Sequence, residues 1–150
     1  MDIFNLNCIH IKENLHSQKE AFERIAELAV LHGLAISQKP VVEGLFKREQ
    51  EGTTGFLDGF AIPHTKSAAI QKPGVIILKS ASGIEWESMD GTDVKFIISL
   101  LIPENEAGTT HLTLLSHISR ILIHNDVRQN LLDATTPEEV ITEFTKAVEA

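Results

Sequence analysis

The chain has 150 residues, of which 43% are apolar, and its formal net charge is −8. This length and composition are typical of a single globular domain, which we expect to span residues 1–150 and to form one well-packed core. The acidic balance argues against a nucleic-acid binder or a peripheral membrane protein, because both need clustered Lys and Arg side chains to offset phosphate charge.

The single cysteine, Cys8, cannot form an internal disulfide, and we interpret it as a small buried hydrophobic residue. Nothing near the N-terminus is typical of a signal peptide, so we expect a cytoplasmic protein. The longest apolar tract, residues 94–102, is interrupted by Lys95 and Ser99 and is far shorter than the roughly 20 residues that cross a bilayer. We therefore interpret it as a buried strand and expect no membrane insertion.

The first structured segments are a weak strand and a helix. Residues 8–11 alternate in the manner of a strand. Ser17 and Glu20 then have the spacing of a capping box, which satisfies free N–H groups at a helix start. Apolar residues with helical spacing follow, so the pattern predicts a helix over residues 18–32, and Gly33 can take the left-handed conformation that ends it.

A second helix and a tight turn come next. Pro40 is typical of a helix start and opens a predicted helix over residues 41–49. Residues 52–55, with the sequence GTTG, interrupt regular structure. Residues 56–62 then predict a hairpin, because the turn pair Asp58-Gly59 lies between two short apolar runs.

Pro63 and His64 follow this hairpin directly. Proline fixes its own φ and has no N–H to give to a sheet, so strand pairing is predicted to end at Pro63. His64 should then lie at the C-terminal mouth of a strand, where chemistry can reach it. Strand ends of this kind are where α/β proteins bind ligands.

Two further strands are rich in β-branched residues and are predicted to be central in the sheet. They cover residues 75–78 and 94–102, with residues 84–86 and the turn at 90–91 between them. Pro103 ends the second of these strands.

The remainder of the chain has helical spacing. It predicts helices over residues 111–123, 126–132 and 137–148, the last with a capping box at Thr136 and Glu139. No repeat or linker divides the chain. We therefore predict an α/β fold in one domain, with a mixed central sheet of about five strands flanked by helices.

Helical geometry separates the histidines of the segment 111–123. His111 falls on the same side as the apolar positions, whereas His117, Arg120 and His124 fall on the opposite side and should face water. His111 also lies at the helix start, where the helix dipole is positive. Two interpretations of His111 remain: a partly buried ring bonded to a nearby carbonyl, or a neutral ring beside a bound anion.

The other histidines are interpreted as surface residues, because none has an acid or a cysteine at metal-ligand spacing. They are His10, His16, His32, His117 and His124. A zinc site has little support, since His117 and His124 are seven residues apart along a helix. We expect neither a metal nor another cofactor.

Arg48, in the last turn of the second predicted helix, has two interpretations. By default its guanidinium complements the helix dipole and stays in water. However, Arg48 comes just before the 52–55 turn that leads towards His64. The guanidinium could therefore bind a phosphoryl group held near the imidazole through two parallel hydrogen bonds.

Several motifs together resemble a known family. The stretches 48–55 (REQEGTTG), 59–64 (GFAIPH) and 110–115 (THLTLL) closely resemble the enzyme IIA component of the fructose and mannitol class of the phosphoenolpyruvate-dependent sugar phosphotransferase system. The similarity runs over nearly the whole chain. It includes residues 83–86 (GIEW) and the turn at 90–91, which look like the fructose-type members.

This resemblance implies a phosphotransferase that serves uptake of a fructose- or mannitol-like sugar. It implies that His64 takes a phosphoryl group from the phosphocarrier protein HPr and passes it to the enzyme IIB component of an IIB/IIC sugar permease. Arg48 and His111 match the two supporting positions of the family. Thr65 stands where Gly, Ala or Thr is found, and Phe60 stands where Ile or Val is commoner, which bears on packing rather than on chemistry.

Two alternatives and one surface prediction accompany this interpretation. The related nitrogen branch uses the same histidine to regulate other proteins, although the 83–86 segment favours the fructose type. A metal-binding module with many histidines is the second alternative. Because two proteins must dock at His64, we expect a shallow depression with an apolar rim formed by Phe56, Phe60 and Leu112.

Overall fold

The computed structural model describes residues 3–106 and 108–149, and all of their side chains except those of residues 108–110, 148 and 149. Within these residues, five strands, five α-helices and one 3-10 helix are present. The strands are β1 (Ile9–Glu13), β2 (Phe60–Ala61), β3 (His64–Ser67), β4 (Gly74–Ile84) and β5 (Val94–Pro103). The helices are the 3-10 helix Leu6–Cys8, α1 (Gln18–Leu31), α2 (Gln38–Glu51), α3 (Gly108–Leu122), α4 (Asn125–Asp133) and α5 (Pro137–Glu149).

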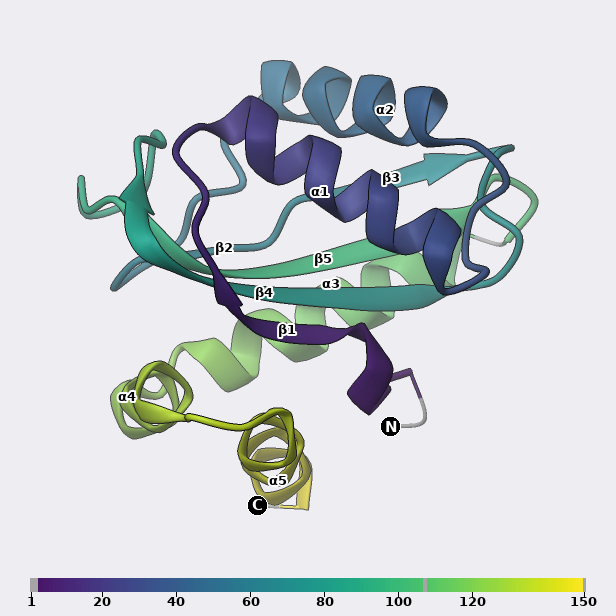
Figure 1. Cartoon of the computed structure of the whole chain (residues 1–150). Helices are drawn as coiled ribbons and strands as arrows, with labels where there is room; N and C mark the ends of the chain where they lie inside the picture. Colours follow the sequence, from purple (N-terminus) through teal and green to yellow (C-terminus); the bar gives the residue numbers. More distant parts are fainter. Residues whose placement is uncertain (1–2, 107, 150) are drawn as a thin grey trace.

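The strands form one mixed sheet in a single α/β domain, which confirms the predicted fold class. Their order is β1-β4-β5-β2, and β3 also pairs with β5 (Figure 1). β4 and β5 are antiparallel, whereas β1 is parallel to β4, and both β2 and β3 are parallel to β5. Since β2 and β3 pair with the same strand, they follow one another along one edge of the sheet, and His64 lies on this edge.

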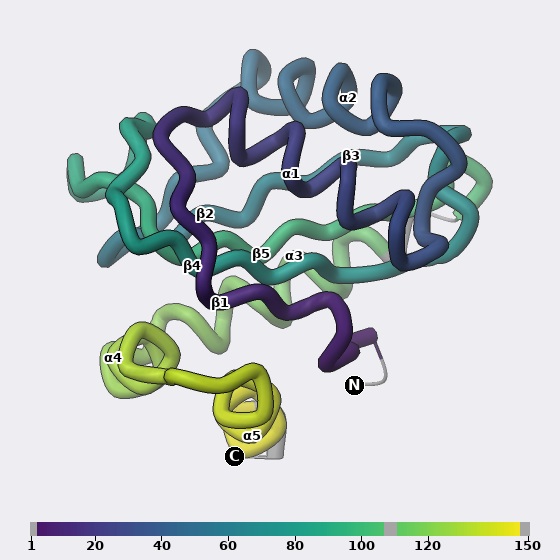
Figure 2. The backbone as a smooth tube through the Cα atoms, viewed as in Figure 1, coloured from purple at the N-terminus to yellow at the C-terminus, as the bar shows by residue number. Residues whose placement is uncertain are grey.

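Helices cover both faces of the sheet. α1 and α2 pack on one face, and α3, α4 and α5 lie on the other (Figures 1 and 2). Side chains of the central strands alternate between the faces: Ile76 and Leu78 join the apolar cluster under α1 and α2, whereas Val75 and Ile77 join the cluster under α3, α4 and α5. The single core expected from the sequence is therefore two apolar clusters separated by the sheet.

The first two helices begin for reasons visible in the sequence. The hydroxyl of Ser17 accepts a hydrogen bond of 3.0 Å from the backbone N–H of Glu20, and Gly33 follows α1 with a φ of +73°, as predicted. α2 begins at Gln38, three residues earlier than expected. Pro40 therefore lies inside the first helical turn, where its missing N–H would have no partner within the helix.

Other elements are longer than predicted. β4 extends over 11 residues to Ile84, well beyond the predicted range 75–78, and α3 begins at Gly108, three residues before the predicted start.

Among the helices of the described residues, none combines the length and apolar character that crossing a membrane requires.

The turn at Asp58-Gly59 forms as predicted, but the hairpin around it does not. Asp58 and Gly59 have φ values of 55° and 82°, and the N–H of Phe56 donates to the carbonyl oxygen of Phe60 over 2.8 Å. The two arms meet in an isolated bridge rather than in a regular ladder. The second arm forms β2, which pairs in parallel with β5 instead.

Pairing along this edge does not end at Pro63, contrary to the prediction. Ala61 pairs with Ile97 and His64 pairs with Leu100, so the register continues through the proline. Pro63 has no N–H, but its carbonyl oxygen accepts a hydrogen bond of 3.1 Å from the N–H of Leu100. Proline is tolerated here because the strand lies at the sheet edge. His64 is therefore the first residue of β3.

Candidate active site

His64 points to the face of the sheet that α3 covers. Phe60, Ile62 and His64 alternate along the edge, and the first two belong to the apolar cluster on that face. Only 4% of the His64 surface is exposed, whereas the sequence predicted an accessible ring. Its Nδ1 lies 2.8 Å from the carbonyl oxygen of Ile62. A carbonyl oxygen can only accept, so in the neutral ring Nδ1 carries the proton and Nε2 keeps its lone pair.

Arg48 lies against this second nitrogen. Its Nε donates to Nε2 of His64 over 3.1 Å, and its Nη1 donates to the carbonyl oxygen of Gly52 over 2.7 Å. The side chain is half-buried rather than free in solvent. Of the two interpretations of Arg48, the structure thus agrees with the one that brings the guanidinium to the imidazole.

Close packing of α2 on β3 places Arg48 there. A Cβ atom on Gly44 would lie 2.2 Å from Oγ1 of Thr65, so this approach requires glycine. Arg48 is four residues after Gly44 and therefore projects from the same side of α2. Because Thr65 directly follows His64, the Gly44 contact carries Arg48 to the His64 ring.

His111 reaches the site from the first turn of α3 and faces inward, as the helical spacing predicts. Its ring centroid lies 4.9 Å from that of His64, and the two rings are inclined by 54°. The Nε2 atom of His111 is shielded from solvent and has no hydrogen-bond partner among the residues that the structure describes. Three side chains from α2, β3 and α3 therefore converge at one edge of the sheet.

Both rings are held in the neutral form. The pKa of His64 is lowered from its ordinary value, mainly by burial, and the positive charge of Arg48 acts in the same direction, as would a proton on the neighbouring ring of His111. The hydrogen bond to Ile62 and the negative charge of Glu49 oppose this change in pKa. Burial also lowers the pKa of His111, with smaller contributions from Lys66 and Arg48. At neutral pH the site thus offers an uncharged nucleophile beside a fixed cation.

This geometry can be compared with known proteins. Residues 2–147 match the family described as the phosphoenolpyruvate-dependent sugar phosphotransferase system, EIIA 2. The chain belongs to this family. The match confirms the resemblance seen in the sequence motifs.

Three proteins illustrate the relationship. The EIIA chain is 36% identical over 144 residues to the fructose-specific EIIA component of Haloferax volcanii, which covers 96% of this chain and 93% of that one. The crystal structure of the nitrogen regulatory protein IIA-Ntr from Neisseria meningitidis is 29% identical, with a TM-score of 0.88 over 95% of this chain and 97% of that one. The enzyme IIAMTL in the complex with phosphorylated enzyme IIBMTL from Escherichia coli has the same fold, at 18% identity and a TM-score of 0.78 over 95% and 96% of the two chains.

Sequence reasoning gave Glu49 no role in the EIIA site. This half-buried residue follows Arg48, and its carboxylate bonds to Thr54 and to Trp86. The available signal was its place in the family-like motif at residues 48–55, but nothing in the sequence indicated which donors the carboxylate would meet. Those donors come from separate segments that only the fold brings together.

The predicted apolar rim of the site is partly wrong. Phe60 is fully buried in the core and cannot contact a partner, because β2 turns it under α3. Leu112, next to His111, is 62% exposed, and Phe56 is partly buried. Met89 is also exposed, and its N–H donates to the carbonyl oxygen of Phe56 over 3.3 Å. Of the three predicted rim residues, Leu112 is therefore exposed beside His111, Phe56 is partly exposed, and Phe60 is buried.

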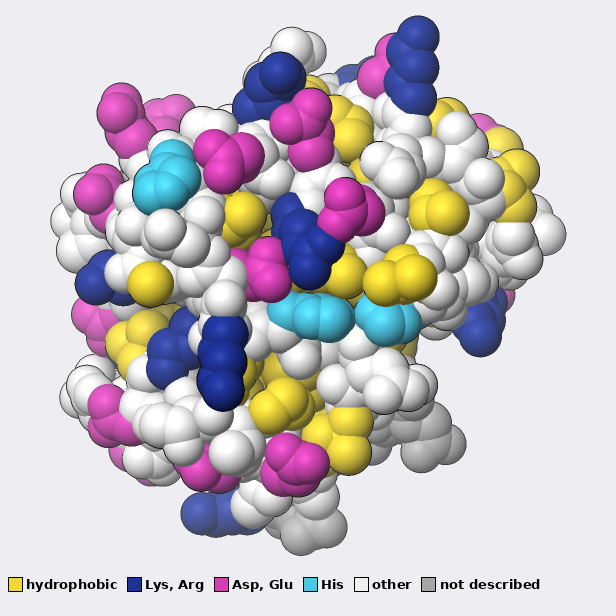
Figure 3. Space-filling model, in the orientation of Figure 1, with side chains coloured by type: hydrophobic (Ala, Val, Ile, Leu, Met, Phe, Trp, Pro, Cys, Tyr) yellow, Lys and Arg dark blue, Asp and Glu magenta, His cyan; other side chains and the backbone are white. Residues whose placement is uncertain are grey.

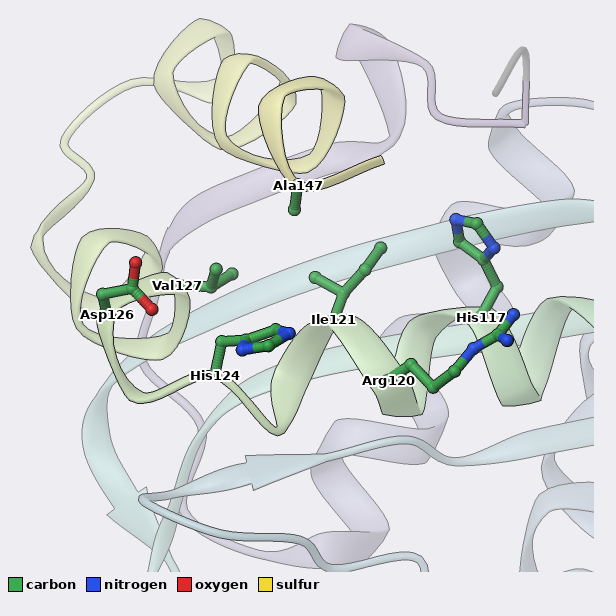
Figure 4. A pocket seen from close by; sticks show the side chains of 7 residues that line it. All are labelled: His117, Arg120, Ile121, His124, Asp126, Val127 and Ala147. Atoms are coloured by element: carbon green, nitrogen blue, oxygen red, sulfur yellow. The ribbon is translucent and has the colours of Figure 1, made fainter. Parts of the chain in front are cut away.

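His117 was predicted to face water, but the structure buries it in part. Its Nε2 is shielded from solvent, and the residue lines a cavity of about 350 Å³ between α3, α4 and α5 (Figure 4). Arg120 and His124 line the same cavity. His117 is partly buried because α5 packs near α3, and a helical wheel of α3 alone does not show this neighbour. This cavity shares no lining residue with the site around His64.

His10 and His32 are also less exposed than predicted. Their Nε2 atoms lie 3.3 Å apart, and adjoining histidine side chains are visible on the face shown in Figure 3. His16 and His124 are exposed, as expected. Within residues 3–106 and 108–149, no three His, Cys, Asp or Glu side chains gather in a way that could hold a metal ion, so the metal-binding interpretation has no ligand set in this part of the chain.

Proposed function

We propose that this EIIA chain is a phosphohistidine carrier of the phosphoenolpyruvate-dependent sugar phosphotransferase system, acting in the cytoplasm as one domain over residues 1–150. In this proposal His64 takes a phosphoryl group from HPr and passes it to an enzyme IIB domain, for uptake of a fructose- or mannitol-like sugar. The observation that carries the proposal is the unprotonated Nε2 of His64, held in place through Nδ1 and flanked by Arg48 and His111.

In the proposed reaction, Nε2 is the nucleophile. Its lone pair attacks the phosphorus of the donor phosphohistidine, a bond from phosphorus to Nε2 forms, and the phosphorus–nitrogen bond of the donor breaks. No proton has to leave Nε2 first. The ring gains positive charge, which the hydrogen bond from Nδ1 to the carbonyl oxygen of Ile62 stabilises. The same charge makes the ring a good leaving group in the next transfer.

Arg48 has two successive tasks in this scheme. Its Nε lies 3.1 Å from Nε2 of His64, along the direction from which phosphorus must approach, so the guanidinium has to move aside. It can then donate its N–H groups to the phosphoryl oxygens, which carry negative charge in the transition state. The hydrogen bond to the carbonyl oxygen of Gly52 keeps the guanidinium close to the ring.

His111 supplies a second donor. Its neutral ring lies beside His64, and its shielded Nε2 is available to donate to a phosphoryl oxygen in the tautomer that carries the proton there. Because this contact is neutral, it stabilises the phosphoryl group only modestly. A modest interaction suits a carrier, since very tight binding of the phosphoryl group would prevent its onward transfer.

Protein partners fit the surface around this site. Leu112, which follows His111 in the chain, exposes an apolar side chain that a docking protein could cover. The Escherichia coli protein of the same fold was solved in a complex with phosphorylated enzyme IIBMTL, which supports an enzyme IIB domain as one partner. HPr is proposed as the other.

A regulatory role is the second candidate function. The observation in its favour is the similarity to the nitrogen regulatory protein of Neisseria meningitidis over nearly the whole of both chains. In that case the phosphorylation state of His64 would control binding to other proteins rather than sugar uptake. Transfer of the phosphoryl group from this chain to a fructose-type enzyme IIB separates the two, since the transport role requires it.

The test of the shared step is labelling by phosphoenolpyruvate in the presence of enzyme I and HPr. We expect about one acid-labile phosphoryl group per chain on the wild type and on the control variant His16→Ala, whose histidine is exposed and remote in sequence. We expect none on His64→Ala. Full labelling of His64→Ala would contradict the proposal.

A further inference from the structure

A half-buried carboxylate beside Arg48 has no part in the chemistry described above. Oε2 of Glu49 accepts hydrogen bonds from the backbone N–H of Thr54 over 2.9 Å and from the indole Nε1–H of Trp86 over 3.2 Å. Oε1 accepts from the hydroxyl of Thr54 over 2.5 Å. One carboxylate thus joins the end of α2 to the loop 52–55 and to the chain that follows β4.

The loop 52–55 in turn holds Arg48. The carbonyl oxygen of Gly52 accepts the hydrogen bond from Nη1 of Arg48. At the other end of the loop, Gly55 packs so closely on the backbone that an added Cβ would lie 2.4 Å from the carbonyl oxygen of Glu87. The loop therefore has little space in which to shift, and its position determines where the guanidinium of Arg48 lies.

The side chain of Trp86 gives this arrangement a rigid anchor. Trp86 is buried in the cluster under α1 and α2, with its ring centroid 5.6 Å from that of Phe22 in an edge-on contact. Its Nε1–H needs an acceptor when buried, and Glu49 provides it. The carboxylate thus ties the loop to the core.

We propose that Glu49 is a positioning residue of the phosphoryl-acceptor site. It fixes the loop 52–55 against Trp86, and the loop presents the guanidinium of Arg48 to His64. This inference rests on the proposed function for its kinetic consequence, although not for its structural one. Glu49 itself touches neither the imidazole nor the incoming group in this scheme.

The proposal assigns the effect to hydrogen bonds rather than to charge, which makes Glu49→Gln informative. A glutamine can place its oxygen where Oε2 accepts from Thr54 and Trp86, and its NH₂ group can donate to the hydroxyl of Thr54. It therefore keeps the three links without the negative charge. Glu49→Ala removes all three links and leaves the two donors of Thr54 and the indole N–H of Trp86 without this acceptor.

The first experiment measures the kinetics of transfer from phosphorylated HPr. We expect Glu49→Ala to lower kcat about tenfold or more with little change in KM, because Arg48 loses its alignment while the docking surface is intact. Glu49→Gln should stay close to the wild type, as should Glu43→Ala, the control for an exposed acid of α2. Glutamine as slow as alanine would overturn the proposal, and so would a change confined to KM.

A double variant tests whether Glu49 acts through Arg48. If it does, adding Glu49→Ala to Arg48→Ala should cause little further loss of rate, because the side chain being positioned is already absent. Losses that multiply would show that Glu49 acts independently of Arg48 and would contradict the proposal. Thermal unfolding of each variant confirms that the rates are compared between folded proteins.

The second experiment uses NMR on the unphosphorylated protein and needs no phosphoryl donor. Trp86 is the only tryptophan, so its indole N–H signal is identified without ambiguity. We expect Glu49→Ala to shift this signal and the Nε2 signal of His64, and Glu49→Gln to shift both much less. Unchanged signals in Glu49→Ala would overturn the proposal. A wild type that accepts no phosphoryl group from HPr would instead refute the proposed function, and the NMR result would still decide the role of Glu49.

Discussion

The ring of His64 differs from that of an exposed histidine in its charge and in its tautomer. Burial favours the uncharged form, and the bond from Nδ1 to the carbonyl oxygen of Ile62 places the proton away from Nε2. Arg48 confirms the same tautomer independently, since its Nε–H needs an acceptor and finds Nε2. Nε2 therefore already has the free lone pair that the proposed transfer requires.

The rate of transfer should depend on pH through this ring. Protonation of Nε2 removes the lone pair, and burial lowers the pKa of His64 below its usual value of about 6.5. We therefore expect the rate to stay constant as the pH falls through 6.5 and to decline only in more acidic solution. Initial rates with pre-phosphorylated HPr check this, with an NMR titration of His64 as the control. A rate that halves at pH 6.5 or above would contradict it.

Substitution of the supporting residues should slow transfer without unfolding the protein. We expect Arg48→Ala and His111→Ala each to lower the rate by about 10- to 100-fold, because in the proposed reaction each removes a donor to the phosphoryl oxygens. Arg48→Lys should remain slow, since an ammonium lacks the forked geometry of a guanidinium. Initial rates of phosphoryl transfer measure the first effect, and thermal unfolding shows whether each variant remains folded. Unchanged rates in both alanine variants would rule out the assigned roles.

At the scale of elements, the contact between α2 and β3 sets the geometry of the site. Gly44 allows the helix to approach Thr65, and the next turn of the helix carries Arg48 to the ring of His64. β3 lies at the edge of the sheet opposite β1, so the contact with α2 is made at a sheet edge.

Gly44→Ala should therefore disturb both stability and transfer. The new Cβ would lie 2.2 Å from Oγ1 of Thr65, so we expect a loss of about 1–3 kcal/mol from overpacking and a slower transfer as Arg48 moves away. Thr65→Ala in the same chain removes the clashing oxygen and should recover most of both. Urea unfolding and the transfer assay measure these effects. If Thr65→Ala recovered neither the stability nor the transfer rate, the α2–β3 contact would not be the cause.

Local sequence signals predicted the elements well where the cause is local. The capping residue Ser17, the turn at Asp58-Gly59 and the inward face of His111 are confirmed. The end of pairing at Pro63 is wrong, because whether a missing N–H matters depends on the partner strand and on the edge position. The burial of His64 was not predictable either, since the segments that cover it are distant in sequence.

At the scale of the whole molecule, the sheet divides the structure into two layers that meet again at the site. Arg48 comes from α2 on one face, and His111 comes from α3 on the other. The sequence indicated all three residues of the candidate site through the family resemblance, but it could not show that the two layers meet at one edge. It also could not reveal Glu49, whose partners Thr54 and Trp86 belong to different segments.

The stability of the whole protein should fall in mildly acidic solution. The pKa values of His32, His64 and His111 are all lowered, mainly by burial. Below a pH of about 6.5 the unfolded chain therefore binds more protons than the folded chain, and the free energy of unfolding decreases as the pH falls. Urea unfolding at several pH values measures this, and the dependence should weaken in His64→Gln. Greater stability on acidification would contradict the prediction.

The most direct test of the account is to locate the phosphoryl group on the protein after reaction with phosphoenolpyruvate, enzyme I and HPr. Phosphorus and nitrogen NMR of the labelled chain identifies both the histidine and the ring nitrogen that carries it. The account predicts a single phosphoryl group on Nε2 of His64, because Nδ1 is committed to the carbonyl oxygen of Ile62. A phosphoryl group on Nδ1, or on any other side chain, would contradict it.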